Sequence, residues 1–305
     1  MTQLIIDCDP GIDDALALML AASSPDVDIV AVTTVTGNRP VEIAAGNARR
    51  ILDLSGMAGV PVYAGAALPI DRDQARCNLV HGEDGLGGVD LGPAMAIEPG
   101  SAVLRIVELL TRHPEHSLTL AAIGPLTNLA LAERTSPGVL RRLKQLLIMG
   151  GALHRRGNIT PAAEFNVYAD PTAAKIVLEA GARIVLFPLD VTEQAVMSAE
   201  WIGALSNLDT ACGRAAGLML QAYAARDPLL HDVCPIAYLL DRSLFQVQRC
   251  GITVECGPGA MEGKTIATFI GPLDDADAQP SILAAMSVRA TALLDAVHAA
   301  FARLP

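Results

Sequence analysis

Hydrophobic positions along the chain fall into short continuous runs, separated by longer segments with the spacing of an amphipathic helix. The runs predict strands at 4–6, 28–34, 60–64, 117–123, 145–149 and 183–186. The segments between them predict helices at 15–20, 40–56, 102–112, 128–133, 139–143 and 170–180. This strand, helix, strand order is typical of a parallel sheet with helices on its faces. We therefore expect an α/β fold with an open, mostly parallel sheet of Rossmann-like character and helices on both faces.

The last third of the chain departs from this order. Its hydrophobic spacing predicts helices at 199–205, 210–225 and 232–240. Alternating β-branched residues then predict short strands within 245–270 and 281–288, before a final amphipathic helix at 290–302. The length and hydrophobic content suffice for one large domain or two small ones, and the sequence has no internal repeat or low-complexity tract. We expect residues 1–305 to form one domain with additional C-terminal helices and strands.

A segment without hydrophobic periodicity, residues 68–100, interrupts the predicted order of strands and helices. It is rich in Gly, Pro and Asp, and a loop of this length is usually a functional flap or a linker. The earlier order resumes afterwards without a change in composition, so we expect a flap. Two interpretations of His81 in this flap are open: it closes over a bound ligand, or it is a solvent-exposed loop histidine.

Four aspartates follow the first predicted strand within eight positions: Asp7, Asp9, Asp13 and Asp14. Like charges crowded at a strand end repel one another unless a positive charge lies among them. Carboxylates are hard oxygen ligands, so the cluster predicts a bound divalent cation, Ca²⁺ or Mg²⁺. A second interpretation is that Asp13 or Asp14 caps the first helix and complements its dipole.

Polar residues follow several other predicted strands at their carboxyl ends. Asn38 follows the second strand, Ile123-Gly124 ends the fourth, and residues 158–166 lie beyond the fifth. In open α/β sheets, ligands bind at this edge. His231-Asp232, at the start of a predicted helix, adds a fifth carboxylate that would complete an oxygen cage around Ca²⁺.

Composition narrows the class of protein. The net charge of −11 argues against a nucleic-acid-binding surface, which needs a basic patch. Charged residues interrupt every long apolar run, so we expect neither a transmembrane segment nor a signal peptide. The cysteines form no C-x-x-C pair and are expected to be buried free thiols of a cytoplasmic protein: Cys8, Cys77, Cys212, Cys234, Cys250 and Cys256.

The segment from Asp7 to Asp14, Asp-Cys-Asp-Pro-Gly-Ile-Asp-Asp, resembles the signature of the nucleoside hydrolases of the inosine–uridine preferring type. The resemblance covers essentially the whole chain. It extends in order to Thr33-Thr34-Val35-Thr36-Gly37-Asn38, Gly124-Pro125-Leu126-Thr127-Asn128, Met149-Gly150-Gly151, Ala163-Glu164-Phe165-Asn166 and His231-Asp232. It implies an enzyme that hydrolyses the N-glycosidic bond of ribonucleosides to ribose and free base.

The resemblance also implies a role for each matching residue. It implies Ca²⁺ held by Asp9, Asp14, Asp232 and the main-chain carbonyl of Ile123, with Asp9 also accepting the proton of the Ca²⁺-bound water. The residues implied to hold the ribose hydroxyls are Asp13, Asn38, Asn158, Glu164, Asn166 and Asp232. His231 is implied to protonate the departing base, and Asp7 to brace the aspartate loop from behind. Members of the family are dimers or tetramers, so the resemblance implies a homodimer or homotetramer.

The low aromatic content bears on the base that the resemblance implies. Aromatic residues make up 3% of the chain and there is one tryptophan, so the site between two tryptophans that would hold a purine is not available. Within the family this disfavours the strictly purine-specific relatives, and the resemblance then implies a pyrimidine such as uridine, or broad inosine and uridine specificity. Tyr223, one helix ahead of His231, has two open interpretations: a contact to the base, or a half-buried helical tyrosine.

Two other functions remain open at this point. A phosphatase of the haloacid dehalogenase type also begins with a strand and an Asp-x-Asp pair on Mg²⁺, and Gly271-Pro272-Leu273-Asp274-Asp275 imitates its last acidic motif. That function leaves Asp13-Asp14, residues 164–166 and His231-Asp232 unexplained. A nucleoside- or ribose-binding protein without turnover would keep the same pocket, although it would not need both Asp9 and His231.

Overall fold

Nine strands form one sheet in the order β3-β2-β1-β4-β5-β6-β9-β7-β8. The computed structural model describes residues 1–271 and 282–305. The strands are β1 (Thr2–Cys8), β2 (Val27–Thr34), β3 (Val62–Ala64), β4 (Leu118–Ala122), β5 (Gln145–Met149), β6 (Ile184–Phe187), β7 (Phe245–Val254), β8 (Thr265–Phe269) and β9 (Ile282–Val288). Only β7 runs against the others, because it pairs antiparallel with both β9 and β8. The expected mostly parallel sheet is confirmed.

Helices connect the strands and cover the sheet. The α-helices are α1 (Ile12–Ala22), α2 (Val41–Leu54), α3 (Ala102–Arg112), α4 (Thr127–Thr135), α5 (Phe165–Ala169), α6 (Pro171–Glu179), α7 (Leu189–Thr192), α8 (Ala199–Ser206), α9 (Ala211–Tyr223), α10 (Val233–Leu240) and α11 (Ala290–Phe301). Two short 3₁₀-helices are η1 (Val139–Arg142) and η2 (Arg242–Leu244).

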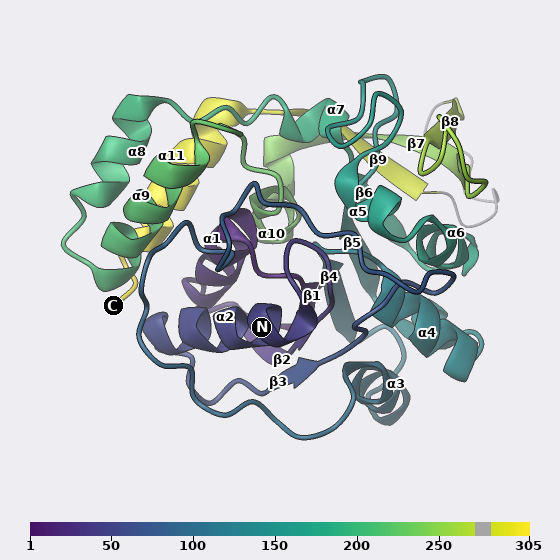
Figure 1. Ribbon diagram of the computed structural model, residues 1–305, viewed down its shortest axis with the longest axis horizontal. Coiled ribbons are helices and arrows are strands. Elements are labelled where there is room, and N and C mark those ends of the chain that lie inside the picture. Colours follow the sequence, from purple (N-terminus) through teal and green to yellow (C-terminus); the bar gives the residue numbers. More distant parts are fainter. Residues whose placement is uncertain (272–281) are drawn as a thin grey trace.

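The sheet has a hydrophobic core on each face. Successive side chains of a strand point to opposite faces, so Leu4 and Ile6 of β1 pack in one core and Ile5 packs in the other. The first core contains residues of α1, α2, α9, α10 and α11, and the second contains residues of α3, α4 and α6. Figure 1 shows the first group and α8 on one side of the sheet and the second group on the other. A strand buried on both faces has apolar residues at successive positions, which is why residues 4–6 of β1 form a continuous apolar run.

The connections of the strands locate the ligand edge. The chain passes from β1 outward through β2 to β3, and then returns to place β4 on the other side of β1. This reversal makes a topological switch point between β1 and β4, where a crevice opens at the carboxyl ends of the strands. Asp9 follows β1 and Ile123 follows β4, so the two residues flank the switch point.

Two short helices near this edge, α5 and α7, were not predicted from the sequence. Helix α5 has five residues and α7 has four, too few for a hydrophobic period to be recognised. The residue before each helix marks its start: the side chain of Glu164 caps α5, and Pro188 precedes α7. The segment predicted as helix at 139–143 is the 3₁₀-helix η1.

The predicted flap is confirmed as a long connection. Residues 65–101, all of them described, contain no helix or strand and are joined to β3 by one bridge between Tyr63 and Glu98. Of the C-terminal predictions, residue 281 of the last strand and residues 272–275 of the phosphatase-like motif lie outside the described residues.

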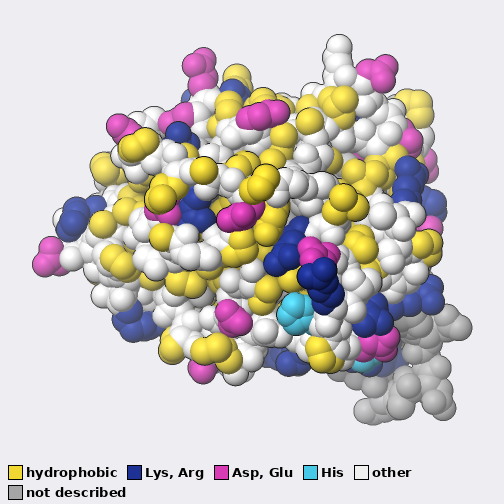
Figure 2. Space-filling model, turned by 90° about the horizontal axis from the view of Figure 1, so that it is seen from below, with side chains coloured by type: hydrophobic (Ala, Val, Ile, Leu, Met, Phe, Trp, Pro, Cys, Tyr) yellow, Lys and Arg dark blue, Asp and Glu magenta, His cyan; other side chains and the backbone are white. Residues whose placement is uncertain are grey.

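The surface and the cysteines add two observations. On the face seen in Figure 2, basic and acidic side chains lie interspersed among hydrophobic ones. Within residues 1–271 and 282–305, no helix has both the length and the apolar character to cross a membrane. All six cysteines are free and four are buried, but Cys77 in the flap is exposed, so the prediction of a buried thiol was wrong there. Because the flap has no apolar period, its sequence does not show which residues are buried: Leu86 packs in the first core, whereas Cys77 does not.

Candidate active site

The loop between β1 and α1 is shaped by its own aspartates. Asp14 accepts hydrogen bonds from the main-chain N–H groups of Asp9, at 3.1 Å, and Gly11, at 2.9 Å. Asp13 accepts one from the N–H of Asp14 at 3.2 Å. Both side chains therefore satisfy main-chain donors around the start of α1, as the capping interpretation expects. Because a carboxylate has about four acceptor positions, these contacts leave room for a cation.

Asp9 is completely buried and only half of its carboxylate is hydrogen-bonded. Oδ2 accepts the main-chain N–H of Asn38 at 2.5 Å, whereas Oδ1 has no hydrogen-bond partner among the described residues. A Cβ added to Gly37 or Gly124 would lie 2.1 or 2.4 Å from one of these oxygens. The two glycines thus leave a slot that the carboxylate fills. An orphaned buried oxygen is costly, and a bound cation would remove that cost.

Asp7 lies behind this loop and ties β1 to β2 and to α4. Its Oδ1 accepts hydrogen bonds from the hydroxyl of Thr33 at 2.5 Å and from the amide of Asn128 at 2.8 Å. Its Oδ2 is buried without a partner among the described residues. Burial raises the pKa of Asp7 to about 7 despite these two hydrogen bonds.

In the described part of the chain, three carboxylates lie close enough together to hold a metal ion. Asp13, Asp14 and Asp232 are buried, and each offers an oxygen within 4.8 Å of the others. Asp232 reaches the cluster from the start of α10. The resemblance assigned Asp13 to the ribose and Asp9 to the metal, whereas here Asp13 belongs to the trio and Asp9 lies beside Asp14.

The electrostatics of this cluster fit a divalent cation. Burial raises the pKa of Asp14 to about 7, with a further contribution from Asp13. Burial and a neighbouring carboxylate likewise raise the pKa values of Asp9 and Asp232 well above their usual range. The carbonyl of Ile123, which lines the same cavity, supplies a neutral oxygen. Buried carboxylates that repel one another, together with a carbonyl oxygen, are the hard donors that Ca²⁺ and Mg²⁺ prefer.

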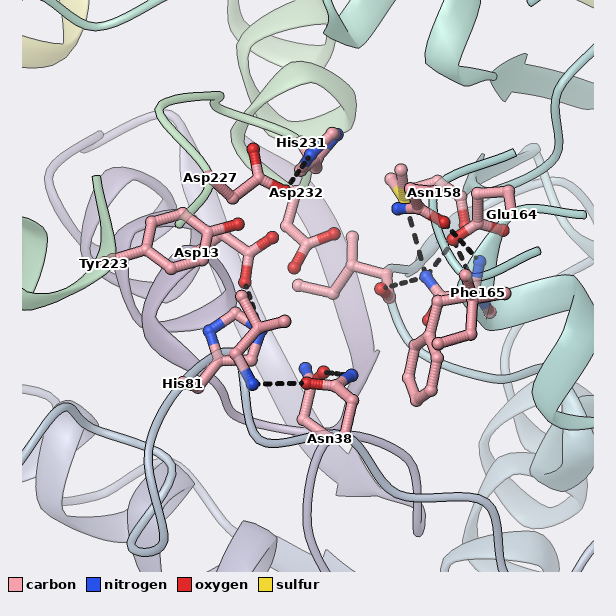
Figure 3. Close-up of a pocket in the computed structure, with 16 residues that line it drawn as sticks. Asp13, Asn38, His81, Asn158, Glu164, Phe165, Tyr223, Asp227, His231 and Asp232 are labelled. Atoms are coloured by element: carbon pink, nitrogen blue, oxygen red, sulfur yellow. Dashed lines mark hydrogen bonds and ion pairs between the residues drawn. The ribbon is translucent and has the colours of Figure 1, made fainter. Parts of the chain in front are cut away.

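The opposite wall of the cavity is polar and held by main-chain contacts. Glu164 accepts hydrogen bonds from the N–H groups of Gly151, Asn166 and Val167 at 2.9, 2.7 and 3.1 Å. Asn166 donates to the carbonyl of Ile123 at 2.8 Å and thereby links this wall to the β4 end. Asn158 accepts the N–H of Phe165 at 2.9 Å. Figure 3 places Asn158 and Glu164 across the cavity from Asp13 and Asp232.

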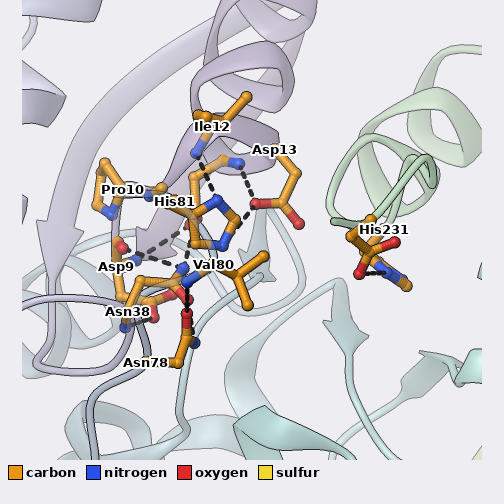
Figure 4. Close-up of polar contacts among 12 residues, drawn as sticks. Asp9, Pro10, Ile12, Asp13, Asn38, Asn78, Val80, His81 and His231 are labelled. Atoms are coloured by element: carbon orange, nitrogen blue, oxygen red, sulfur yellow. Dashed lines mark hydrogen bonds and ion pairs between the residues drawn. The ribbon is translucent and has the colours of Figure 1, made fainter. Parts of the chain in front are cut away.

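The flap closes a third side. Asn78 donates to the side-chain oxygen of Asn38 at 2.8 Å, and His81 accepts the main-chain N–H of Ile12 at 3.1 Å (Figure 4). The His81 ring stacks on Tyr223 with centroids 5.0 Å apart. Burial lowers the pKa of His81 to about 4, so it is neutral at pH 7. His81 is therefore not solvent-exposed, and Tyr223 is fully buried rather than half-buried.

His231 is buried at the fourth side with both ring nitrogens engaged. Nδ1 lies 2.8 Å from the hydroxyl of Thr192, and Nε2 lies 3.2 Å from a carboxylate oxygen of Asp227. Burial by itself lowers the pKa of His231, but the hydrogen bond and charge of Asp227, followed by the charges of Asp13 and Glu164, raise it above its ordinary value. A raised pKa keeps a proton on the ring near neutral pH, which suits an acid.

The structure brings most of the sequence-predicted residues to one cavity. Those lining it are Asp13, Asn38, His81, Ile123, Asn158, Glu164, Asn166, His231 and Asp232. Asp7, Asp9 and Asp14 are not among the lining residues: Asp7 is in β1, Asp9 is in the loop that follows, and Asp14 is in the first turn of α1. The lining residues that sequence analysis did not predict are Asn78, Val80, Met149, Ile159, Phe165 and Asp227. Most flank a predicted residue, and Asp227, four positions before His231, had no signal other than that spacing.

Comparison with known proteins decides the family. The model of the inosine-uridine preferring nucleoside hydrolases matches residues 4–295. The chain belongs to this family. It is 35% identical over 282 residues to the inosine-uridine preferring nucleoside hydrolase of Leishmania major, covering 88% of each chain. It is 40% identical over 273 residues to the pyrimidine-specific ribonucleoside hydrolase RihA of Photobacterium profundum, covering 86% of this chain and 87% of that protein.

Solved structures agree with this assignment. The purine-preferring ribonucleoside hydrolase from Gardnerella vaginalis superposes with a TM-score of 0.90 at 28% sequence identity, covering 99% of this chain and 98% of that one. The chain is thus an enzyme of the nucleoside hydrolase family, which hydrolyses ribonucleosides at the N-glycosidic bond. The phosphatase and the binding protein without turnover, both left open by the sequence, were wrong.

We expect Gly124→Ala to disable the hydrolase without changing any polar residue. The added Cβ would lie 2.4 Å from Oδ1 of Asp9 and must displace the carboxylate. We predict weaker cation binding and a loss of base release, measured by calorimetry and by a spectroscopic assay. Gly203→Ala is the matched control, since its Cβ would meet nothing within 4 Å. Wild-type cation affinity and turnover in Gly124→Ala would contradict the role given to this slot.

We also expect Asp7 to make the cation-free hydrolase less stable as pH rises. Its pKa is about 7 in the folded chain and 3.8 in the reference state, so the unfolded chain loses the proton first. Stability should therefore fall between pH 4 and 7, by about 4 kcal/mol, and then level off. Urea unfolding of wild type and Asp7→Asn in chelator, from pH 4 to 8, measures it. Asp7→Asn should remove its share of the fall and leave the share of the other buried carboxylates, such as Asp14. An unchanged profile would contradict the prediction.

Proposed function

We propose that this enzyme hydrolyses ribonucleosides to ribose and free base with Ca²⁺ as its cofactor, Asp9 acting as the base and His231 as the acid. The observation that carries the proposal is that one cavity is bounded by the aspartate loop, by His231 and by the polar wall of Asn158 and Glu164. The ribose and the leaving base would then lie between a carboxylate cluster and a proton donor.

The cation would be held by Asp9, Asp14, Asp232 and the carbonyl oxygen of Ile123. Bound there, Ca²⁺ would position a water molecule and lower its pKa. Asp9 is suited to take the proton of the attacking water because its Oδ1 is not committed to another donor among the described residues. Asp7, hydrogen-bonded to Thr33 and Asn128, braces the loop and has no direct part in the reaction.

The ribose hydroxyls would be bound by the polar residues around the cavity: Asp13, Asn38, Asn158, Glu164, Asn166 and Asp232. Their rotamers are already fixed by hydrogen bonds, such as those from Gly151 and Val167 to Glu164. A pocket built for hydroxyl groups rejects an analogue that lacks one, because its buried polar groups are left unpaired. A 2′-deoxynucleoside should therefore be a poor substrate.

Charge explains why carboxylates surround the sugar. Cleavage of the bond between C1′ and the base nitrogen develops positive charge on the ribose ring, as it does in O-glycoside hydrolysis. Preorganised carboxylates stabilise that charge where it develops. His231 would donate a proton to the base, so that the base leaves in its neutral form.

The base would lie against the flap and α9. Val80, His81 and Tyr223 line this part of the cavity, and none of the described lining residues is a tryptophan. We propose a preference for uridine and other pyrimidine nucleosides, or for inosine and uridine together. His81, neutral and buried, would contact the base rather than the solvent.

A substrate panel tests this proposal. Base release is measured for uridine, cytidine, inosine, adenosine, 2′-deoxyuridine and 2′-deoxyinosine, before and after treatment with a chelator, and again after Ca²⁺, Mg²⁺ or Zn²⁺ is added back. We expect release from uridine, loss of activity with chelator and recovery with Ca²⁺. No release from any ribonucleoside at saturating Ca²⁺ would contradict the function, and recovery with Zn²⁺ alone would contradict the cofactor.

Three further properties stay predictions. We propose that residues 1–305 act as one nucleoside hydrolase domain, that the enzyme is a homodimer or homotetramer, and that it is cytoplasmic. Its partner would be a small-molecule ribonucleoside, with neither nucleic acid nor membrane involved. Light scattering of the purified chain checks the oligomeric state.

A further inference from the structure

We propose that Asp227 is a positioning residue: it orients the imidazole of His231 and keeps the transferable proton on Nε2, at the wall of the cavity. The inference rests on the proposed function, because it takes His231 as the acid of that reaction. It adds a residue that none of the sequence motifs contains. Figure 3 shows Asp227 beside His231, joined to it by a hydrogen bond.

The two contacts of the ring fix its orientation. Thr192, the fully buried last residue of α7, holds Nδ1 at 2.8 Å, and Asp227 holds Nε2 at 3.2 Å. These partners come from opposite sides of the ring and from different parts of the chain. With both contacts in place, the imidazole cannot flip without losing a hydrogen bond.

The chemistry of the two partners also decides which nitrogen carries the hydrogen. A carboxylate accepts hydrogen bonds and does not donate them, so Asp227 requires an N–H at Nε2. The hydroxyl of Thr192 can either donate or accept, so it tolerates Nδ1 with or without a hydrogen. In a neutral histidine the tautomer follows from the partner of each nitrogen. Asp227 therefore holds a hydrogen on Nε2 in the neutral ring and in the imidazolium alike. The imidazolium, whose second hydrogen is donated from Nδ1 to Thr192, is the form that can give up the Nε2 proton as an acid.

Asp227 lies where that proton has to be delivered. Both Asp227 and His231 line the cavity, and the Asp227 side chain is 22% exposed. The turn that carries it is fixed by the main-chain hydrogen bonds of Arg226 and Asp227 to the carbonyl of Tyr223, at 2.9 and 3.0 Å. Among the described residues, His231 is the group that a hydrogen bond joins to the Asp227 carboxylate. Removing this carboxylate should therefore disturb His231 and little else.

The proton balance assigns no proton to Asp227. His231 begins as the imidazolium, with one hydrogen on Nε2 and one on Nδ1 that is donated to Thr192. When the bond from C1′ to the base nitrogen breaks, its electron pair stays on the base, which takes the proton from Nε2 and leaves a neutral ring with its hydrogen on Nδ1. The attacking water forms the new C1′–O bond and gives its proton to Asp9. Asp227 releases the N–H as the base takes it, and solvent afterwards reprotonates Nε2.

The test compares two substrates on the Ca²⁺-saturated enzyme. We expect Asp227→Ala to lower kcat for uridine and inosine by about 10- to 100-fold, less than the about 10²–10⁴-fold that loss of the general acid itself costs, because His231 remains. Hydrolysis of p-nitrophenyl riboside, whose leaving group needs no proton, should change less than threefold. Asp227→Asn should lose less, because its amide oxygen still accepts from Nε2. The Asp227→Asn variant also tests the inference if Asp227→Ala does not fold.

Two controls separate this role from a structural one. The double variant Asp227→Ala/His231→Ala should be no slower than His231→Ala alone, because both changes remove one function. Asp209→Ala, at a fully exposed carboxylate ahead of α9, should match wild type. The ¹⁵N chemical shifts of His231 should report hydrogen at Nε2 in wild type and a mixture of tautomers in Asp227→Ala.

Several outcomes would overturn the inference. Three results would each remove Asp227 from this role. The first is that Asp227→Ala loses as much activity on p-nitrophenyl riboside as on natural nucleosides. The second is that the double variant is slower than His231→Ala alone, and the third is that the ¹⁵N shifts of His231 are the same in wild type and Asp227→Ala. If wild type releases base and His231→Ala is selective for natural nucleosides while Asp227→Ala is not, only this inference fails. If wild type releases no base, the proposed function fails and the inference fails with it.

Discussion

Replacement of Asp9 by alanine is expected to abolish base release while leaving a folded protein. The side chain is fully buried, and its Oδ1 has no hydrogen-bond partner among the described residues. The variant therefore loses the proposed general base and a proposed cation ligand together. Loss of a general base alone typically costs about 10²–10⁴-fold, and we expect at least the upper figure. Turnover of uridine at saturating Ca²⁺ is the measurement, with circular dichroism to verify the fold.

Two comparisons sharpen this experiment. Asp26→Ala removes an exposed aspartate at the opposite edge of the sheet and should match wild type. Calorimetry of Asp9→Ala with uridine should still detect binding, because the ribose contacts on the Glu164 wall remain. If Asp9→Ala keeps more than a tenth of wild-type turnover, another group accepts the proton.

Replacement of His231 by alanine is expected to separate natural nucleosides from activated ones. A uracil or hypoxanthine leaving group needs a proton, so kcat for uridine and inosine should fall by about 10²–10⁴-fold. p-Nitrophenolate leaves without a proton, so p-nitrophenyl riboside should be hydrolysed at nearly the wild-type rate. The ratio of the two kcat values, wild type against variant, is therefore the readout.

The control for this variant is a histidine outside the cavity. His298→Ala, in α11, should leave the rates on both substrates unchanged, since His298 does not line the pocket. Equal losses of His231→Ala on both substrates would remove His231 from the acid role and indicate a structural contribution. The Asp227 inference would fall with that result.

The fold was largely predictable because the chain repeats a strong local pattern. Strands buried on both faces, such as β1 and β4, are continuous apolar runs, and the helices between them have clear apolar periods. Helices α5 and α7 were not predictable in this way, because a side-chain cap or a preceding proline starts them and no period has room to develop. These two short helices nevertheless carry Asn166 and Thr192, which contact Ile123 and His231.

The candidate site was predictable where a motif carried it. Asn38, Ile123, Glu164 and His231 follow from strand ends and from the family resemblance, and all four line the cavity. The sequence could not show that Asp13 joins Asp14 and Asp232 in the closest carboxylate trio, since the distances between oxygens depend on side-chain rotamers. Nor could it show that His81 is buried against Tyr223, because a loop has no period from which to read its orientation.

By itself, then, the sequence determined the parallel α/β architecture, the edge at which ligands bind, and the crowding of aspartates that calls for a cation. Each of these follows from local spacing or from the repulsion of neighbouring charges. Only the tertiary structure decided which side chains meet: Gly124 against Asp9, the flap against α9, and Thr192 against His231. Such contacts join segments whose relative positions are set by packing of the whole chain. No local pattern contains that information.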